Sequence, residues 1–129
     1  MDLLSQFNPE HIGFMQHNGV WLDDSGSYPP AVLVDVQEYS KNPYGIVHGG
    51  LYFTMMDIAA YLVAHEDGRN YVTQGGNIHF YRSATHGRLS ATASLAHRGH
   101  TVCTMNTEIR DEEGTLLADG SFTMFFVEI

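Results

Sequence analysis

The stretch IVHGGLYFTMMDIAA, residues 46–60, decides the fold. It opens with a histidine and two glycines and then runs apolar on every side of a helix, apart from one carboxylate, Asp57. A helix without a polar face has to be covered from all sides, and a curled antiparallel sheet wrapped around it would do so. The stretch therefore predicts an α+β fold in which one sheet encloses a long central helix.

Short segments of alternating apolar and polar residues flank this helix and predict strands. Two strands precede it and four follow it, in residues 18–24, 31–39, 70–84, 87–99 and 100–129. The last of these segments predicts a hairpin that turns at Glu113-Gly114. Gly68 is a natural left-handed terminator for the helix, and Gly75-Gly76 indicates a bulge or a close backbone approach. Residues 1–7 predict a short additional helix.

Composition and charge narrow the classes of partner. The chain has 129 residues, 43% of them apolar, which fits a single domain spanning residues 1–129. Its formal net charge of −9, with only six Lys and Arg, argues against nucleic acid or an anionic membrane surface as a partner. The apolar run from Leu51 to Ala64 is too short to span a membrane. Because no secretory signal pattern opens the chain, we expect a cytoplasmic protein.

Cysteine and histidine usage gives no sign of a metal or redox centre. Cys103 is the only cysteine, so neither an internal disulfide nor a CxxC-type site can form. Alternation places it with Met105 and Ile109 on the core face of a strand. The eight histidines include no HExxH or similarly spaced cluster. We therefore expect no metal.

The carboxylate of Asp57 has two interpretations. An aspartate in a helix usually marks a solvated face, but residues three and four positions away share its face. These neighbours carry no charge: Phe53, Thr54, Ala60 and Tyr61. A lone carboxylate in such surroundings loses hydration, which raises its pKa and makes it a stronger base. The local sequence therefore favours a functional role.

The start of the helix offers a second functional group. Gly49 and Gly50 lie where the first turn begins, and the first N–H groups of a helix have no internal partner. Such N–H groups can stabilise a developing oxyanion, and glycine lets a ligand approach the backbone closely. The alternative is plain turn flexibility.

One chain cannot bring these two groups together. His48 and Asp57 lie nine residues apart, about 13 Å along a helix. If two chains pack their helices antiparallel about a two-fold axis, Asp57 of one lies near Gly49 of the other. The free edges of the sheet also favour association. We therefore expect a homodimer or homotetramer, with two equivalent sites at each dimer interface.

These residues together resemble a known family. Asn42, then His48-Gly49-Gly50, then Asp57 nine residues after the histidine, resembles the pattern of the hotdog-fold acyl-coenzyme A thioesterases of the phenylacetate-degradation type. The later stretch GGNIHFYRSA, residues 75–84, is similar to the strand motif NIxFLRPA of that family, with Ser83 in place of the proline. The resemblance covers most of the chain after about residue 15.

The resemblance implies roles for five residues. In that family the carboxylate matching Asp57 is general base or nucleophile on an acyl-coenzyme A thioester, and the N–H matching Gly49 polarises its carbonyl. The residues matching Asn42 and His48 position water and the acyl group, and a residue matching Thr73 supports the carboxylate. Each of these three residues also has a simpler interpretation: Asn42 as a turn residue, His48 as a helix cap and Thr73 as an ordinary strand residue. No cofactor is implied beyond the coenzyme A of the substrate.

Coenzyme A is polyanionic, whereas the chain has few cations. Candidates for contacting it are Gly50, Arg82, Arg88, Arg98, His97 and His100. Each of the five basic residues has the simpler interpretation of a solvated surface residue. Two further functions stay open, namely a hotdog hydratase or dehydratase acting on acyl thioesters and a non-catalytic module that binds acyl-coenzyme A. The acyl chain is not determined by the sequence.

Overall fold

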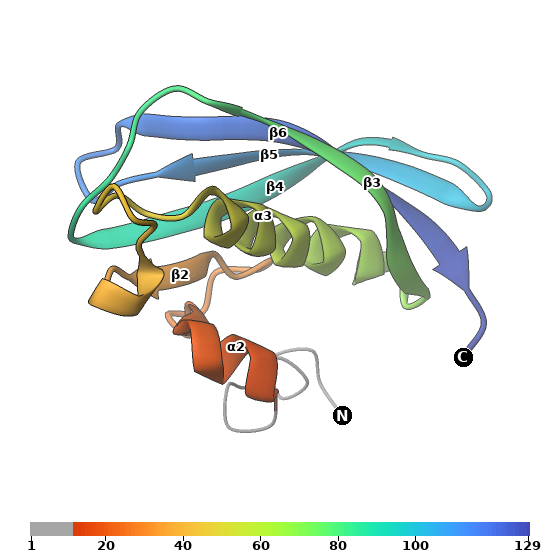
Figure 1. Ribbon diagram of the computed structural model, residues 1–129. Coiled ribbons are helices and arrows are strands. Elements are labelled where there is room, and N and C mark those ends of the chain that lie inside the picture. The colour runs from red at the N-terminus through yellow and green to blue at the C-terminus, as the bar shows by residue number, and fades with distance from the viewer. Residues whose placement is uncertain (1–11) are drawn as a thin grey trace.

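The computed structural model describes residues 12–129, in which a curled antiparallel sheet holds one long helix in its concave side (Figure 1). In chain order the elements are α2 (Gly13–Asn18), β1 (Val20–Leu22), β2 (Val32–Asp35), the 3-10 turn η1 (Glu38–Ser40), α3 (Gly49–Ala64), the 3-10 turn η2 (His65–Asp67), β3 (Asn70–Phe80), β4 (Arg88–Arg98), β5 (Val102–Arg110) and β6 (Leu116–Val127). The predicted order of two strands, one long helix and four strands is confirmed. The helix predicted in residues 1–7 lies outside the described residues.

The six strands form one antiparallel sheet in the order β1-β2-β4-β5-β6-β3. The hairpin of β5 and β6 turns through residues 111–115, as predicted. The predicted strand 31–39 is shorter than expected, because Gln37 and Ser40 bond each other's backbone N–H and start η1. Within the described chain β3 pairs only with β6, so β3 is an edge strand 11 residues long.

Local hydrogen bonds fix both ends of α3. His48 is the N-cap, with extended backbone, and its Nδ1 accepts from the Gly50 N–H at 2.8 Å. At the other end the helix tightens into η2, and Gly68 terminates that turn with a φ of 80°. The predicted terminator is thus confirmed, one 3-10 turn beyond the end of the α-helix.

The two glycines of the Gly75-Gly76 pair serve different structural purposes. The register between β3 and β6 shifts between Thr73 and Gly75, which is the predicted bulge. Gly76 faces inward, and a Cβ there would lie 2.6 Å from the ring of Phe122. Only glycine fits this approach without moving the buried Phe122.

The core lies between the concave face of the sheet and α3. Cys103, Met105 and Ile109 are fully buried there, so the predicted core face of β5 is confirmed. The expectation that the chain covers α3 on all sides is wrong, however. The sheet covers only the face that carries the buried helix residues, and Phe53 remains 39% exposed with Asp57 half-buried. One face of α3 is therefore open along its length.

Within residues 12–129, no helix is long and apolar enough to cross a membrane. The cytoplasmic location predicted from the sequence stays a prediction.

Candidate active site

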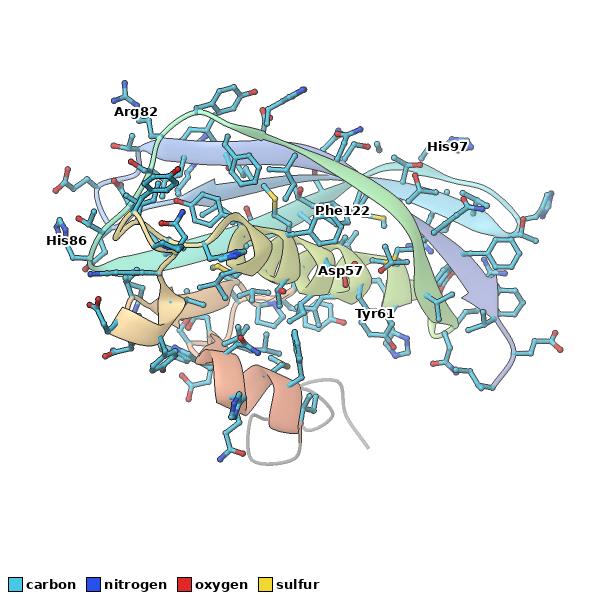
Figure 2. The ribbon with its side chains drawn as sticks, in the orientation of Figure 1. Asp57, Tyr61, Arg82, His86, His97 and Phe122 are labelled. Atoms are coloured by element: carbon cyan, nitrogen blue, oxygen red, sulfur yellow. The ribbon has the colours of Figure 1, made fainter. Side chains whose placement is uncertain are left out.

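Asp57 lies in the middle of α3 on the open face, and its side chain points away from the sheet interior (Figure 2). Its Oδ1 accepts a short hydrogen bond from the Thr73 hydroxyl. Loss of hydration raises the pKa of Asp57, and the hydrogen bond from Thr73 opposes part of that rise. No cation among the described residues forms an ion pair with it. The group is a carboxylate of increased basicity that is open to a ligand.

Thr73 reaches Asp57 from the edge strand β3, beside the bulge. It is the last residue before the register shift, on the face of β3 that is turned toward α3. Its hydroxyl also lies 3.5 Å from the sulfur of Met124, which is buried on the neighbouring strand β6. The thioether accepts hydrogen bonds weakly, so the hydroxyl proton is directed to Asp57. No pattern in the sequence indicated that Met124 would contact Thr73.

Aromatic rings flank Asp57 on the open face of α3. Phe53, one turn earlier, packs edge-on against Phe122 with ring centroids 4.9 Å apart. Tyr61, one turn later, stacks on His65 at 5.4 Å, and Figure 2 shows it beside Asp57. The predicted uncharged surroundings of Asp57 are present in the structure. They explain why its carboxylate is poorly hydrated.

At the N-terminus of α3, one N–H group is left without an acceptor. His48 Nδ1 accepts from Gly50, and the Leu51 N–H donates to the His48 carbonyl at 3.0 Å. The Tyr52 N–H points to the same carbonyl at 3.5 Å. The Gly49 N–H bonds none of the residues 12–129. It is a free donor at the positive end of the helix dipole, whereas the Gly50 N–H is already used.

A cavity of about 310 Å³ opens beside Gly49. Its walls include Asn42, Tyr52, Phe80 and Arg82. The side-chain oxygen of Asn42 accepts from two main-chain N–H groups in its own turn, at 2.9 and 3.4 Å. Its amide NH₂ is therefore the part left for a ligand. Asn42 can therefore stabilise its own turn, as the simpler interpretation of the sequence predicted, and also contact a ligand.

The two candidate groups do not meet within one chain. Gly49 and Asp57 belong to the same straight helix, at positions about 12 Å apart along its axis. Asn42 and His48 lie at the end with Gly49, and Thr73 lies with Asp57. The predicted residues therefore form two half-sites, one at the start of α3 and one at its middle.

Two of the five basic residues predicted to contact the phosphates are occupied by internal partners. Arg88 forms a bidentate pair with Asp35, at 2.7 and 3.1 Å, and lies over the ring of Trp21. Arg98 donates to the carbonyl of Ala64 at the end of α3 and to Asp67. These contacts give both arginines structural roles that their spacing in the sequence could not reveal.

Arg82 is the exception among the cations. All six Lys and Arg lie within residues 12–129, and five of them form ion pairs with carboxylates. Arg82 forms none with a carboxylate of residues 12–129, and it lies two residues after the end of β3, in the wall of the cavity beside Gly49. His97 and His100 lie at the far end of β4 from it, so they do not join this cavity.

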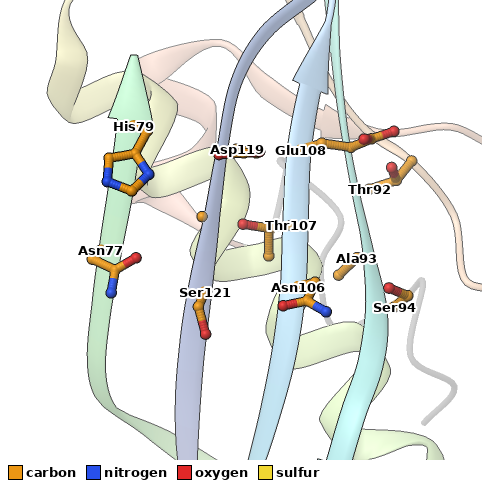
Figure 3. Close-up of a pocket in the computed structure, with 11 residues that line it drawn as sticks. Asn77, His79, Thr92, Ala93, Ser94, Asn106, Thr107, Glu108, Asp119 and Ser121 are labelled. Atoms are coloured by element: carbon orange, nitrogen blue, oxygen red, sulfur yellow. The ribbon is translucent and has the colours of Figure 1, made fainter. Parts of the chain in front are cut away.

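A larger cavity, of about 540 Å³, lies on the outer face of the sheet, turned away from α3 (Figure 3). Rows of polar side chains cross it, and the register aligns Asn77, Ser121 and Asn106. None of the predicted site residues lines it. Among residues 12–129, no group of three or more His, Cys, Asp or Glu is placed to hold a metal ion.

Similarity to known proteins connects this geometry with a family. The model of the thioesterase superfamily matches residues 44–118, a range that includes Gly49, Asp57 and Thr73. A hypothetical thioesterase protein from Streptococcus pneumoniae, solved with coenzyme A, is 31% identical over 76% of this chain and 80% of that one, with a TM-score of 0.72. Two variants of that protein, Asp to Ala and Thr to Ala, have also been solved. The two altered positions lie sixteen residues apart, as do Asp57 and Thr73.

Two more distant structures show the fold over nearly the whole chain. A conserved protein from Pseudomonas aeruginosa aligns over 98% of this chain and 100% of its own, with a TM-score of 0.85 and 22% identity. The PaaI protein of the E. coli phenylacetic acid degradation operon aligns over 92% and 87%, with a TM-score of 0.82 and 21% identity. The predicted hotdog fold is thereby confirmed.

Proposed function

The chain belongs to the thioesterase superfamily and is a thioester hydrolase, and on that premise we propose that it hydrolyses acyl-coenzyme A to a free acid and coenzyme A. The observation that carries the proposal is the lone Asp57 carboxylate, bonded by Thr73 on the open face of α3. A carboxylate with a raised pKa can take a proton from water or attack a carbonyl itself. Coenzyme A in the related S. pneumoniae structure supports the choice of thioester.

The reaction uses both half-sites. Asp57 acts as general base on water, or as nucleophile, and a new C–O bond forms at the thioester carbon. The carbonyl oxygen gains negative charge and accepts from the free Gly49 N–H, an interaction worth roughly 3–4 kcal/mol in comparable sites. The C–S bond then breaks, and coenzyme A leaves as a thiol with the proton that Asp57 took from water. If Asp57 is the nucleophile, breakage of the C–S bond leaves a mixed anhydride on Asp57, which water then hydrolyses to the free acid while its proton goes to the thiolate. His48 and Asn42 hold water and the acyl group at the same end of the helix.

A second copy of the chain completes the site. Within the described chain β3 is an edge strand whose Thr73 bonds Asp57 on the open face of α3, and its Val72 is 47% exposed. Pairing of two β3 strands about a two-fold axis would extend the sheet and cover Phe53. With the helices antiparallel, Asp57 of each subunit faces Gly49 of the other. The proposed unit is therefore a homodimer, alone or within a tetramer.

The altered positions of the S. pneumoniae relative support the pair of residues proposed here. An aspartate and a threonine were replaced in that protein, at the spacing that separates Asp57 from Thr73. In this chain the same spacing corresponds to a direct hydrogen bond between the two side chains. We therefore assign Thr73 to the positioning of the Asp57 carboxylate.

Arg82 is proposed to contact the anionic part of coenzyme A. Among residues 12–129 it is the Lys or Arg without an ion pair, and it lines the cavity beside Gly49, where the proposed reaction places the thioester carbonyl. Arg88 and Arg98 are left out of this role because their donors are already used. His100 and His97 stay sequence predictions.

Thr73→Val should shift the pH dependence of hydrolysis. Asp57 must be ionised to act, so activity falls as the pH drops through its pKa. The Thr73 hydrogen bond lowers that pKa, and removing it should move the acid limb of the kcat profile to higher pH. Thr73→Ser keeps the hydroxyl and should retain the wild-type limb. An unshifted profile in Thr73→Val would show that the hydroxyl does not act on the base.

Arg82→Met and Arg98→Met should affect different properties, the first coenzyme A binding and the second stability. The first should weaken coenzyme A binding about tenfold in calorimetry and leave urea unfolding unchanged, because the Arg82 side chain has no ion-pair partner among residues 12–129. The second removes a donor to two helix carbonyls and to Asp67, so stability should fall by about 2 kcal/mol. Equal coenzyme A affinity in wild type and Arg82→Met would remove Arg82 from the site.

Thiol release from a panel of acyl-coenzyme A substrates tests the proposed function itself. We expect stoichiometric free thiol and free acid from at least one acyl class. Conversion without thiol release would indicate hydration or dehydration of the acyl chain. Binding without any conversion would indicate a non-catalytic module.

A further inference from the structure

Phe53 lies at the centre of the open face of α3. Among the large apolar side chains of this helix, all of which the structure describes, it is the most exposed, at 39%. It comes four residues after Gly49 and four residues before Asp57, the two groups that the proposed reaction uses. Phe53 is therefore midway between them, about 6 Å from each along the helix axis.

Core packing holds the ring of Phe53 in place. The ring meets Phe122 edge-on, with centroids 4.9 Å apart, and Phe122 is fully buried. Phe122 in turn lies so close to β3 that a Cβ at Gly76 would come within 2.6 Å of its ring. Phe53 thus rests against a ring that has little room to withdraw. It forms a fixed wall on the open face.

The proposed dimer places this wall at the two-fold axis. If Asp57 of each subunit faces Gly49 of the other, a residue midway between these positions faces its own copy. The two Phe53 rings then meet across the axis and separate the two sites. Each thioester carbonyl is left with about 6 Å, measured along the helix, before the axis is reached.

The two arms of the thioester leave the carbonyl in different directions. Arg82, the proposed contact for coenzyme A, shares its cavity with Ile46 and Val47, which precede the helix. Coenzyme A therefore extends beyond the start of α3, away from the axis. The carbonyl stays at the Gly49 N–H, and the acyl tail is left with the direction of Phe53.

The helix surface between the two groups suits an apolar tail. Asp57 is the only charged residue of α3. The hydroxyl of Thr54, next to Phe53, already donates to the carbonyl of Gly50 at 3.0 Å. A polar tail would find few partners on this surface, whereas a hydrocarbon tail can pack on the ring of Phe53.

We propose that Phe53 sets the length of the acyl group, as the wall at which the acyl tail ends. The inference deepens the proposed function and rests on it, and it assigns to the site an acyl-coenzyme A with a short, apolar acyl group. A longer tail would meet the Phe53 rings at the axis before its carbonyl reached the Gly49 N–H.

Phe53→Ala and Phe53→Trp test the inference in opposite directions. Release of thiol from a series of straight-chain saturated acyl-coenzyme A esters gives kcat/KM for each chain length. In Phe53→Ala the optimum should move to longer chains, with the ratio of longer to shorter substrates raised at least about tenfold, the usual effect of one methylene group in an apolar pocket. In Phe53→Trp the optimum should move to shorter chains.

The ratio of two substrates on one protein does not depend on how much of that protein is folded or dimeric. A substitution that only destabilises the chain or the dimer lowers kcat/KM for every substrate by the same factor. An unchanged order of substrates in Phe53→Ala and Phe53→Trp would therefore overturn the proposal, whatever the total activity.

Phe125→Ala is the matched control. Phe125 is 40% exposed, nearly as much as Phe53, but it lies on β6 between positions that alternate with the buried Phe122 and Met124. Its side chain therefore faces the outer side of the sheet, away from α3. This variant should keep the wild-type preference for chain length. A shift as large as that of Phe53→Ala would contradict the inference.

The wild type tells failure of this inference from failure of the proposed function. If it releases no thiol from any acyl-coenzyme A, the proposed function fails and the inference falls with it. If it releases thiol, but the Phe53 variants keep its chain-length order, the inference alone fails and Asp57 keeps its role.

Discussion

Replacing Asp57 by asparagine is expected to lower kcat for thioester hydrolysis by about 10³-fold, within the range that positioned acid–base groups contribute. Asparagine has the same shape and can still accept from Thr73, but it can neither take a proton nor attack a carbonyl. The structure offers no substitute, because the neighbours of Asp57 on the open face of α3 are Phe53 and Tyr61. Release of free thiol under saturating substrate measures the effect.

The same variant should be at least as stable as the wild type. The pKa of Asp57 is raised in the folded protein, so ionisation of this group opposes folding at pH values above its folded pKa. Asparagine removes that penalty. Its advantage should be largest at neutral pH and should disappear as the pH falls through the raised pKa to the ordinary Asp range. Near-normal turnover by Asp57→Asn would reject the assignment of the base.

Gly49→Pro is expected to lower kcat by about 10²-fold to 10³-fold, the usual cost of losing one oxyanion donor. Proline has no N–H, yet it is favourable at the first position of a helix. His48 already has the extended backbone that a following proline requires, with φ −65° and ψ 134°. The substitution thus deletes one donor while α3 still forms, which circular dichroism can verify.

Gly49→Ala is the control for the added side chain. A Cβ at this position would lie 3.2 Å from the ring tip of Phe80, which is 56% exposed and free to move by the few tenths of an ångström required. Alanine keeps the N–H, so kcat should stay within a few-fold of wild type. A similar loss of kcat in Gly49→Pro and Gly49→Ala would mean that the site needs the absence of a side chain at this position, and not the N–H group.

Much of the fold could be predicted because single residues restrict the backbone strongly. The apolar stretch of α3 with one acid, the left-handed Gly68 and the Gly75-Gly76 bulge each act through local geometry that a sequence displays. The pairing of Thr73 with Asp57 was implied by the family resemblance, and the structure shows it as a hydrogen bond from the Thr73 hydroxyl to Asp57, next to the bulge in β3.

Other features depend on contacts between distant residues and could not be read from the chain. The ion pair of Arg88 joins β4 to Asp35, 53 residues earlier, and Arg98 meets Asp67 from 31 residues away. The sequence therefore presented them as available cations. The open face of α3 was also missed, because an apolar helix residue does not reveal whether its own chain or a second copy covers it.

Mixed dimers test the central claim most directly, namely that each site joins Asp57 of one subunit to the Gly49 N–H of the other. Asp57→Asn and Gly49→Pro chains with different tags would be co-expressed, and the species that carries both tags isolated. The account predicts that two inactive parents give mixed dimers with about half of the wild-type kcat, since one of the two sites then has both groups intact. If Asp57 and Gly49 act within one chain, the mixed dimers would be as inactive as their parents.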